Sequence, residues 1–143
     1  MPEERSYSGT CHCDAIRGAL HSAKPPAELQ VRACQCSYCT RQGSITVSDP
    51  DGRAVFEIDR AVLTTYQFGT RTGTSLLCGR CGVYAGVMRE EDGRIWSVLN
   101  VRGLAMAEFL GRTPEPVMYD GETPEQRTAR RKTKWTPTEI RYV

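Results

Sequence analysis

The chain has 143 residues, of which 39% are hydrophobic and 25% charged, and its formal net charge of +2 is too balanced to indicate nucleic-acid binding by itself. This composition is typical of one globular domain and excludes a disordered chain. No apolar run approaches the ~18 residues that span a bilayer, and residues 1–5 lack a signal-peptide core, so we expect one domain over residues 1–143, in the cytoplasm and without a membrane partner.

Alternation of apolar and polar residues predicts β-strands along most of the chain. Turn residues at 49–52 predict a hairpin between the third and fourth strands, and those at 90–93 predict one between the last two. In chain order, the expected strands cover residues 15–20, 29–33, 44–48, 54–58, 62–68, 75–77, 83–88 and 95–101.

Helical composition is confined to short stretches. Residues 104–110 contain neither glycine nor proline and are expected to form a helix, and a short helix is expected after Cys36. From residue 113 the chain changes character, with prolines and acidic residues first and then five cations within residues 127–134. Because Trp135 and later residues are apolar, we expect this tail to pack back on the sheet as an extension of the same domain.

The seven cysteines are the most informative feature of the composition. An odd number and a reducing cytosol argue against a closed set of disulfides. Every cysteine lies in a cluster, which is not expected of scattered core residues, so metal binding is the leading interpretation. The clusters read C-x-C, C-x-C-x-x-C and C-x-x-C, with members Cys11 and Cys13, then Cys34, Cys36 and Cys39, then Cys78 and Cys81.

Zinc takes four ligands at a structural site, and three protein ligands plus an open position at a catalytic site. Seven thiolates therefore divide as four plus three. Cys78 and Cys81, with their glycine neighbours, resemble a zinc knuckle that needs two more ligands. Cys11 and Cys13 would share one face of an extended strand and can supply them. The third cluster, Cys34, Cys36 and Cys39, would then form an open site; one zinc with three ordinary thiols is the alternative.

Three thiolates around Zn²⁺ leave a net charge of −1, which weakens the activation of water but keeps the preference for sulfur. We therefore expect this site to bind a thiol and to make or break a carbon–sulfur bond, as in a hemithioacetal. A base or a relayed water must take the hydroxyl proton; His12 and His21 are the candidate histidines, but a surface or structural role explains each better, and no base is evident. The first candidates for contacting the thiol substrate are Ser37 and Tyr38 inside the cluster and Arg41, Gln42 and Ser44 after it.

The clusters and their neighbours resemble the glutathione-dependent formaldehyde-activating enzyme family, which includes the domain found in centromere protein V. The match covers about residues 7–110 and leaves a divergent extension over 111–143. Asp14, Gln35 and Leu77 depart from the family pattern but spare every cysteine. The resemblance is carried by residues 9–16 (GTCHCDAI), 34–41 (CQCSYCTR) and 78–82 (CGRCG), with Leu63, Tyr66 and residues 98–101 (VLNV) in support.

The resemblance implies a mainly β, Mss4-like fold, or β-tent, with a few short helices and two zinc ions per chain. It assigns a structural zinc to Cys11, Cys13, Cys78 and Cys81 and a catalytic zinc to Cys34, Cys36 and Cys39. It further implies a lyase for adducts of glutathione, or a similar thiol, with formaldehyde or another small aldehyde. Glutathione carries two carboxylates, for which Arg41, Arg102 and the cations of residues 127–134 are candidate partners.

A non-catalytic module is the main alternative, either a thiol carrier, a zinc-dependent scaffold or a partner-binding domain, because no base is evident. Methionine sulfoxide reduction needs a free cysteine beside two C-x-x-C pairs, and the sequence has one isolated pair. The basic run could meet nucleic acid, but a solvated charged face explains it, so we expect no nucleic-acid partner.

Overall fold

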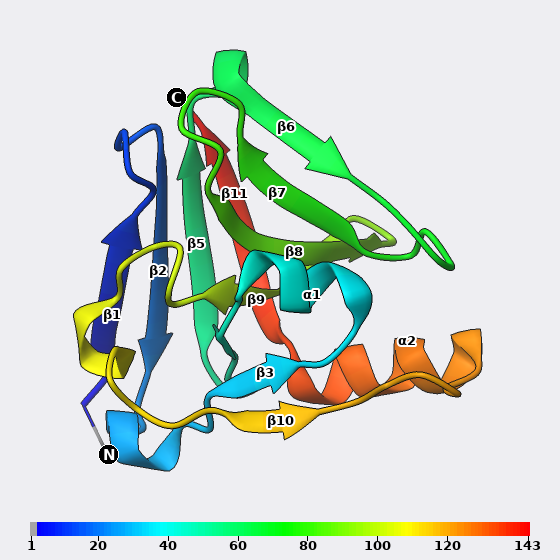
Figure 1. The fold of residues 1–143 in the computed structure, drawn as a ribbon. Coiled ribbons are helices and arrows are strands. Elements are labelled where there is room, and N and C mark those ends of the chain that lie inside the picture. The colour runs from blue at the N-terminus through cyan, green and yellow to red at the C-terminus, as the bar shows by residue number, and fades with distance from the viewer. Residues whose placement is uncertain (1–2) are drawn as a thin grey trace.

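The structure is a computed structural model that describes residues 3–143, and it is mainly β (Figure 1). Eleven strands form one connected sheet. The strands are β1 (Arg5–Thr10), β2 (Ile16–Ser22), β3 (Arg32–Cys34), β4 (Thr46–Val47), β5 (Arg53–Ile58), β6 (Leu63–Tyr66), β7 (Thr74–Cys78), β8 (Tyr84–Glu91), β9 (Arg94–Asn100), β10 (Glu115–Val117) and β11 (Thr136–Tyr142). The α-helices are α1 (Ser37–Gln42) and α2 (Pro124–Lys134), and the 3-10 turns are η1 (Pro26–Glu28), η2 (Arg60–Val62) and η3 (Ala107–Phe109).

Strand β9 is the junction of the sheet. One edge of β9 pairs with β8, and the other pairs first with β11 and then with β4. From β11 the sheet continues through β5 and β2 to β1, whereas β8 leads to β7 and β6, and β4 leads to β3 and β10. In Figure 1, β1, β2, β5 and β11 stand side by side while β6 and β7 cross the view at a steep angle to them. The mainly β prediction is confirmed.

The hairpin predicted at residues 90–93 is confirmed. Strands β8 and β9 pair antiparallel from Gly86 with Leu99 to Glu91 with Arg94. Asp92 and Gly93 both have positive φ angles, 53° and 78°, as a two-residue hairpin turn with the right twist requires.

The hairpin predicted at residues 49–52 is wrong, although the turn itself is present. The amide of Gly52 donates to the carbonyl of Asp49 at 3.1 Å. Strand β4 pairs with β3 and β9, however, and β5 pairs with β2 and β11. The buried carboxylate of Asp49 accepts hydrogen bonds from Ser22 and Lys24, and its amide donates to Thr136. These contacts direct the chain toward β2 and β11 instead of back along β4.

The helix predicted over residues 104–110 is also wrong, since only the 3-10 turn η3 forms there. Ala105 has a φ of 51°, which an α-helix excludes. The segment lies across β1 and β2 where Gly9 pairs with Gly18, and a Cβ on Gly9 would meet the carbonyl oxygen of Leu104 at 1.9 Å. Leu104 and Met106 are thereby fully buried, so tertiary packing overrides helical composition here.

The C-terminal extension forms two elements. Strand β11 lies between β5 and β9, and Trp135 is buried just before it, so the prediction that the tail packs on the sheet is confirmed. Helix α2, which is absent from the predicted elements, begins with a capping box between Thr123 and Gln126 and has Pro124 at its first position. This T-P-x-Q pattern is a helix-start signal that could have located it.

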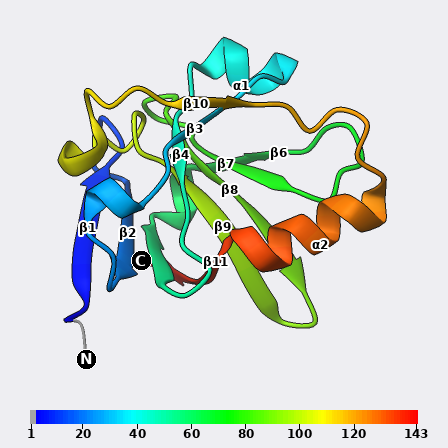
Figure 2. The same ribbon diagram turned by 90° about the horizontal axis from the view of Figure 1, so that it is seen from below.

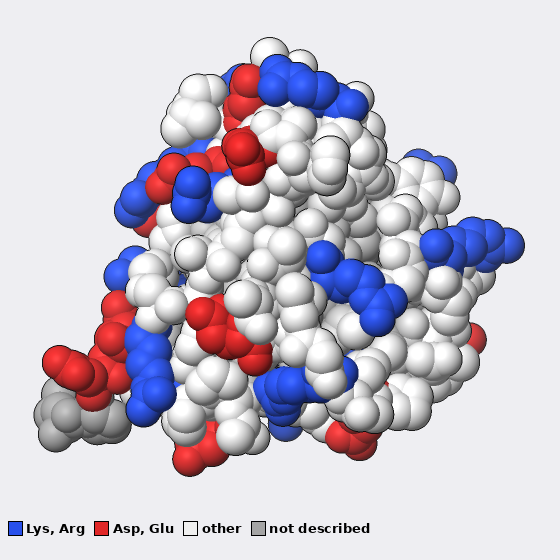
Figure 3. Space-filling model, turned by 60° about the vertical axis from the view of Figure 1, so that its left-hand side comes forward, with Lys and Arg blue, Asp and Glu red and all other residues white. Residues whose placement is uncertain are grey.

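Within residues 3–143, no helix is long and apolar enough to cross a membrane. On the face that Figure 3 shows, basic and acidic residues are intermixed and neither forms a continuous patch. The cytoplasmic location and the single-domain boundary stay predictions.

Candidate metal centres and the adjoining cavity

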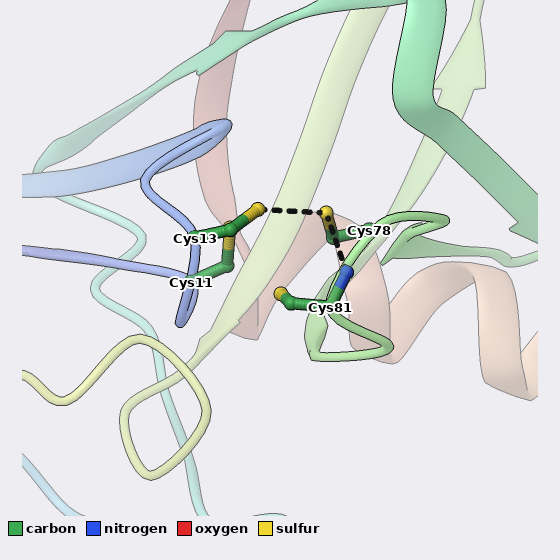
Figure 4. A group of neighbouring side chains, drawn as sticks. All are labelled: Cys11, Cys13, Cys78 and Cys81. Atoms are coloured by element: carbon green, nitrogen blue, oxygen red, sulfur yellow. Dashed lines mark hydrogen bonds between the residues drawn. The ribbon is translucent and has the colours of Figure 1, made fainter.

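The first candidate metal centre joins two distant turns of the chain (Figure 4). Cys78 ends β7, and Cys81 follows in the next loop, while Cys11 and Cys13 lie in the turn between β1 and β2. The expectation that Cys11 and Cys13 share a face of a strand is therefore wrong. The turn brings them together instead, and the four sulfur atoms lie within 4.8 Å of one another. We call this set the closed cluster.

The geometry of the closed cluster fits a tetrahedral metal. The Cys11 and Cys13 sulfurs are 3.8 Å apart, and those of Cys13 and Cys78 are 3.5 Å apart. Zn–S bonds of about 2.3 Å in a tetrahedron would place the sulfurs about 3.8 Å apart. Backbone N–H groups of Ile16 and Cys81 donate to the sulfurs of Cys11 and Cys78, which favours thiolates. All seven cysteines of the chain are free.

The protonation of the closed cluster is uneven. Burial raises the pKa of the Cys11 thiol to about 11. Burial also acts to raise the pKa of the Cys81 thiol, but hydrogen bonds outweigh it and lower this pKa to about 6. These hydrogen bonds come from the backbone at Val83 and Cys13 and from the thiols of Cys78 and Cys11. Thiols packed this closely share protons without a metal, and they would release them on binding a metal.

The second candidate metal centre, the open cluster, consists of Cys34, Cys36 and Cys39, whose sulfurs also lie within 4.8 Å of one another. Cys34 ends β3, Cys36 is the N-cap of α1, and Cys39 lies in its first turn. The short helix expected after Cys36 is thus confirmed. The Cys39 amide donates to the Cys36 sulfur at 3.3 Å, which closes the loop around the cluster.

The same sharing of protons holds in the open cluster. A hydrogen bond from Cys39 lowers the pKa of the Cys34 thiol to about 6, against the effect of burial. That contact and burial raise the pKa of Cys39. The two clusters confirm that the chain has two groups of cysteines that could hold metal ions, divided four and three as the spacing predicts.

A cavity of about 620 Å³ adjoins the open cluster, and its volume is typical of small-molecule sites. All three cysteines of the open cluster line it. Aromatic side chains form another part of the wall: the Tyr38 ring lies 5.2 Å from Phe68 and 5.4 Å from Tyr84 between centroids. Burial raises the pKa of Tyr84 well above its ordinary value, so its hydroxyl stays protonated and can donate a hydrogen bond.

Charged residues from the C-terminal extension complete the wall. Arg127, Arg130 and Arg131 of α2 line the cavity together with Asp120, and Arg32 of β3 adds a fourth cation from outside the extension. The basic run predicted a possible partner of carboxylates, but the sequence does not distinguish the residues of this run that line the cavity. Asp120, one acidic residue among several in the tail, carried no sequence signal.

The predicted substrate contacts fall into two groups. Ser37 and Tyr38 line the cavity, whereas Arg41, Gln42 and Ser44 do not. Arg41 donates to the Ser37 carbonyl of its own helix, and Ser44 is buried. The structure therefore gives no support for substrate contact by Arg41, Gln42 and Ser44.

Three other residues weighed in the sequence also lie away from the cavity wall. Arg102 donates to the Gly43 carbonyl. His12 is exposed in its turn, and His21 bonds Ser6. Neither histidine can act on a molecule in this cavity.

No model of a known protein family matches the chain. A solved structure does: the crystal structure of a Rhodobacter sphaeroides protein, a structural-genomics target, is 33% identical with a TM-score of 0.52. The alignment covers 78% of this chain and 99% of that one. Because the identity extends over nearly the whole of its length, the chain belongs to the same family as this Rhodobacter sphaeroides protein.

Proposed function

We propose that the protein is a zinc-dependent carbon–sulfur lyase that acts on adducts of a small thiol, such as glutathione, with formaldehyde or another small aldehyde. The observation that carries the proposal is the open cluster: three cysteines, rather than four, lie on the wall of a cavity of small-molecule size. The resemblance of the cysteine motifs to the formaldehyde-activating family supports the choice of substrate. The proposed fold is correspondingly Mss4-like.

The two clusters have different parts in this proposal. Cys11, Cys13, Cys78 and Cys81 offer four sulfurs and would hold a structural zinc ion. Cys34, Cys36 and Cys39 would hold a second zinc, which when bound supplies a sulfur-seeking Lewis acid with one free position. A thiol in the cavity can approach that position, since the three cysteines face the cavity.

In the lyase direction, the C–S bond of the adduct RS–CH₂–OH breaks, and the sulfur keeps the electron pair. The carbon becomes formaldehyde as its hydroxyl proton is lost, so a group near the carbon must take that proton. Among residues 3–143, Asp120 is the one carboxylate residue that lines the cavity, and it is our candidate for taking the proton. Tyr84, held protonated by burial, can donate a hydrogen bond to the aldehyde oxygen.

A non-catalytic thiol carrier is the second candidate function. It is favoured by one observation: Asp120 is exposed to solvent, and no histidine lines the cavity in the described part of the chain. A carrier would bind the thiol without accelerating its reaction with the aldehyde. A zinc-dependent scaffold would not bind the thiol at all.

The test is exchange NMR between formaldehyde and its glutathione adduct, with zinc-loaded protein. We expect exchange above the buffer rate, in proportion to protein concentration, and its loss in Cys36→Ser. Arg41→Gln is the matched control because Arg41 lies one turn away on α1 but off the cavity wall, and it should retain the activity. Glutathione binding without acceleration would replace the lyase by a carrier, and no binding would leave a scaffold.

A further inference from the structure

We propose that α2 determines which thiols enter the site: its cavity-facing arginines, Arg127, Arg130 and Arg131, select a substrate that carries carboxylates. This inference deepens the proposed function and rests on it. It assigns a binding role to the C-terminal extension, the part of the chain outside the motif resemblance.

Helix α2 presents its cations to different surroundings. Arg127, Arg130 and Arg131 line the cavity, whereas Lys132 pairs with Glu91 outside it, at 2.6 Å. Figure 2 shows α2 along the side of the sheet, connected to β10 by the loop that carries the acidic residue of the wall, Asp120. The run is therefore not a uniformly solvated face.

Arg131 is held rigidly at the cavity. Its Nη1 donates to the Thr72 hydroxyl at 2.8 Å, and its guanidinium lies 4.8 Å from the centre of the Trp135 ring. Packing is also tight at Gly73, where an added Cβ would come within 3.2 Å of Nη2. A cation fixed in this way loses little conformational entropy when it binds an anion.

The charge of Arg131 is compensated only at longer range, by Glu122. It forms no ion pair with any residue of 3–143, and its Nε is buried without a hydrogen-bond partner. Burial and the neighbouring arginines lower its pKa to about 10, so it is still a cation at neutral pH. A buried donor of this kind gains most from an anionic ligand.

Arg130 and Arg127 share one counter-ion. Glu122 accepts two hydrogen bonds from Arg130, at 2.8 and 3.0 Å, and its carboxylate lies 3.5 Å from the Nε of Arg127. Arg130 also lies over the ring of Tyr119, 3.6 Å from its centre. Glu122 can compensate one of these two charges, which leaves a positive excess on this wall.

The charge balance of the cavity therefore favours an anionic ligand. Four arginines and one carboxylate, Asp120, line the cavity, and Glu122, which pairs with Arg127 and Arg130, is not among the lining residues. Guanidinium and carboxylate groups match in geometry, because two parallel N–H···O bonds can form. A thiol with two carboxylates would place its sulfur at the open cluster and its carboxylates at α2.

Calorimetry with two matched ligands tests this inference on the zinc-loaded protein. Glutathione and its diethyl ester carry the same thiol and differ in carboxylate charge. We expect the ester to bind about tenfold to hundredfold more weakly, since charge-assisted hydrogen bonds are lost. Equal affinity for both ligands would overturn the inference and leave the proposed function intact. Binding of neither ligand would instead remove the proposed function.

Variants assign the effect to the helix. Arg131→Gln should weaken glutathione about tenfold and leave the ester unchanged, and Arg127→Gln, at a second position on the cavity wall, should weaken glutathione selectively as well. Lys134→Gln removes the same charge from the same helix outside the cavity wall and should change neither affinity. Equal losses in Lys134→Gln and Arg131→Gln would show only a general effect of net charge and would overturn the assignment.

Discussion

The two cysteine clusters share a C-x-x-C core but differ in what surrounds it. The closed cluster joins segments 65 residues apart, and Cys11 and Cys78 are each 1% exposed. The open cluster lies within six consecutive residues, 34–39, and its cysteines are half-buried on a cavity wall. In the proposed function, sulfur count and surroundings, rather than the motif, would separate a structural centre from a reactive one.

The largest expected effect comes from opening the closed cluster. Cys81→Ser removes one of the four sulfurs that could hold a metal between the turn after β1 and the end of β7. Structural zinc contributes on the order of 10 kcal/mol, as much as the whole stability of a typical domain. We expect the variant to be unfolded at 25 °C by circular dichroism. A cooperative melt close to that of the wild type would show that the closed cluster does not hold the fold.

Release of the two zinc ions to a chelator should occur in two kinetic phases. A chelator can reach the open cluster through the cavity, whereas the buried sulfurs of Cys11 and Cys78 are released only when the turns separate. With a chromogenic chelator, we expect one zinc to leave quickly with no change in circular dichroism, and the second slowly with unfolding. Release of both ions in one phase, together with unfolding, would contradict the difference between the clusters.

A small effect is expected from a hydroxyl beside the open cluster. The Tyr38 hydroxyl is buried beside Ser75 and Gln42 but makes no hydrogen bond of good geometry within the described residues. Tyr38→Phe keeps the ring packed on Phe68 and Tyr84, so we expect the free energy of unfolding to be unchanged or up to about 1 kcal/mol higher. A loss of more than about 1 kcal/mol in urea melts would show that the hydroxyl supports the fold.

Local patterns predicted what depends on neighbours in the sequence. The paired strands β8 and β9 followed from alternation and a turn with an Asp-Gly pair, and the division of the cysteines followed from spacing alone. These features need no knowledge of the remaining chain.

Features set by distant contacts were not predictable in this way. The turn at Asp49 leads away from β4 because Ser22 and Thr136 form hydrogen bonds with Asp49. Residues 104–110 do not form the predicted helix because Gly9 and Gly18 leave space for them to pack across β1 and β2. At the site, the basic run was visible in the sequence. The orientation of the Arg131 side chain at the cavity depends on its hydrogen bond to Thr72, 59 residues earlier in the chain, which no local pattern predicts.

The most direct test of two separate centres is the metal content of Cys36→Ser, measured by native mass spectrometry beside the wild type. Serine is also a good N-cap, so α1 should keep its start while the open cluster loses a ligand. We predict two zinc ions in the wild type and one in Cys36→Ser, with the circular dichroism and melting of the wild type. An unfolded Cys36→Ser, or one that still holds two ions, would contradict the account.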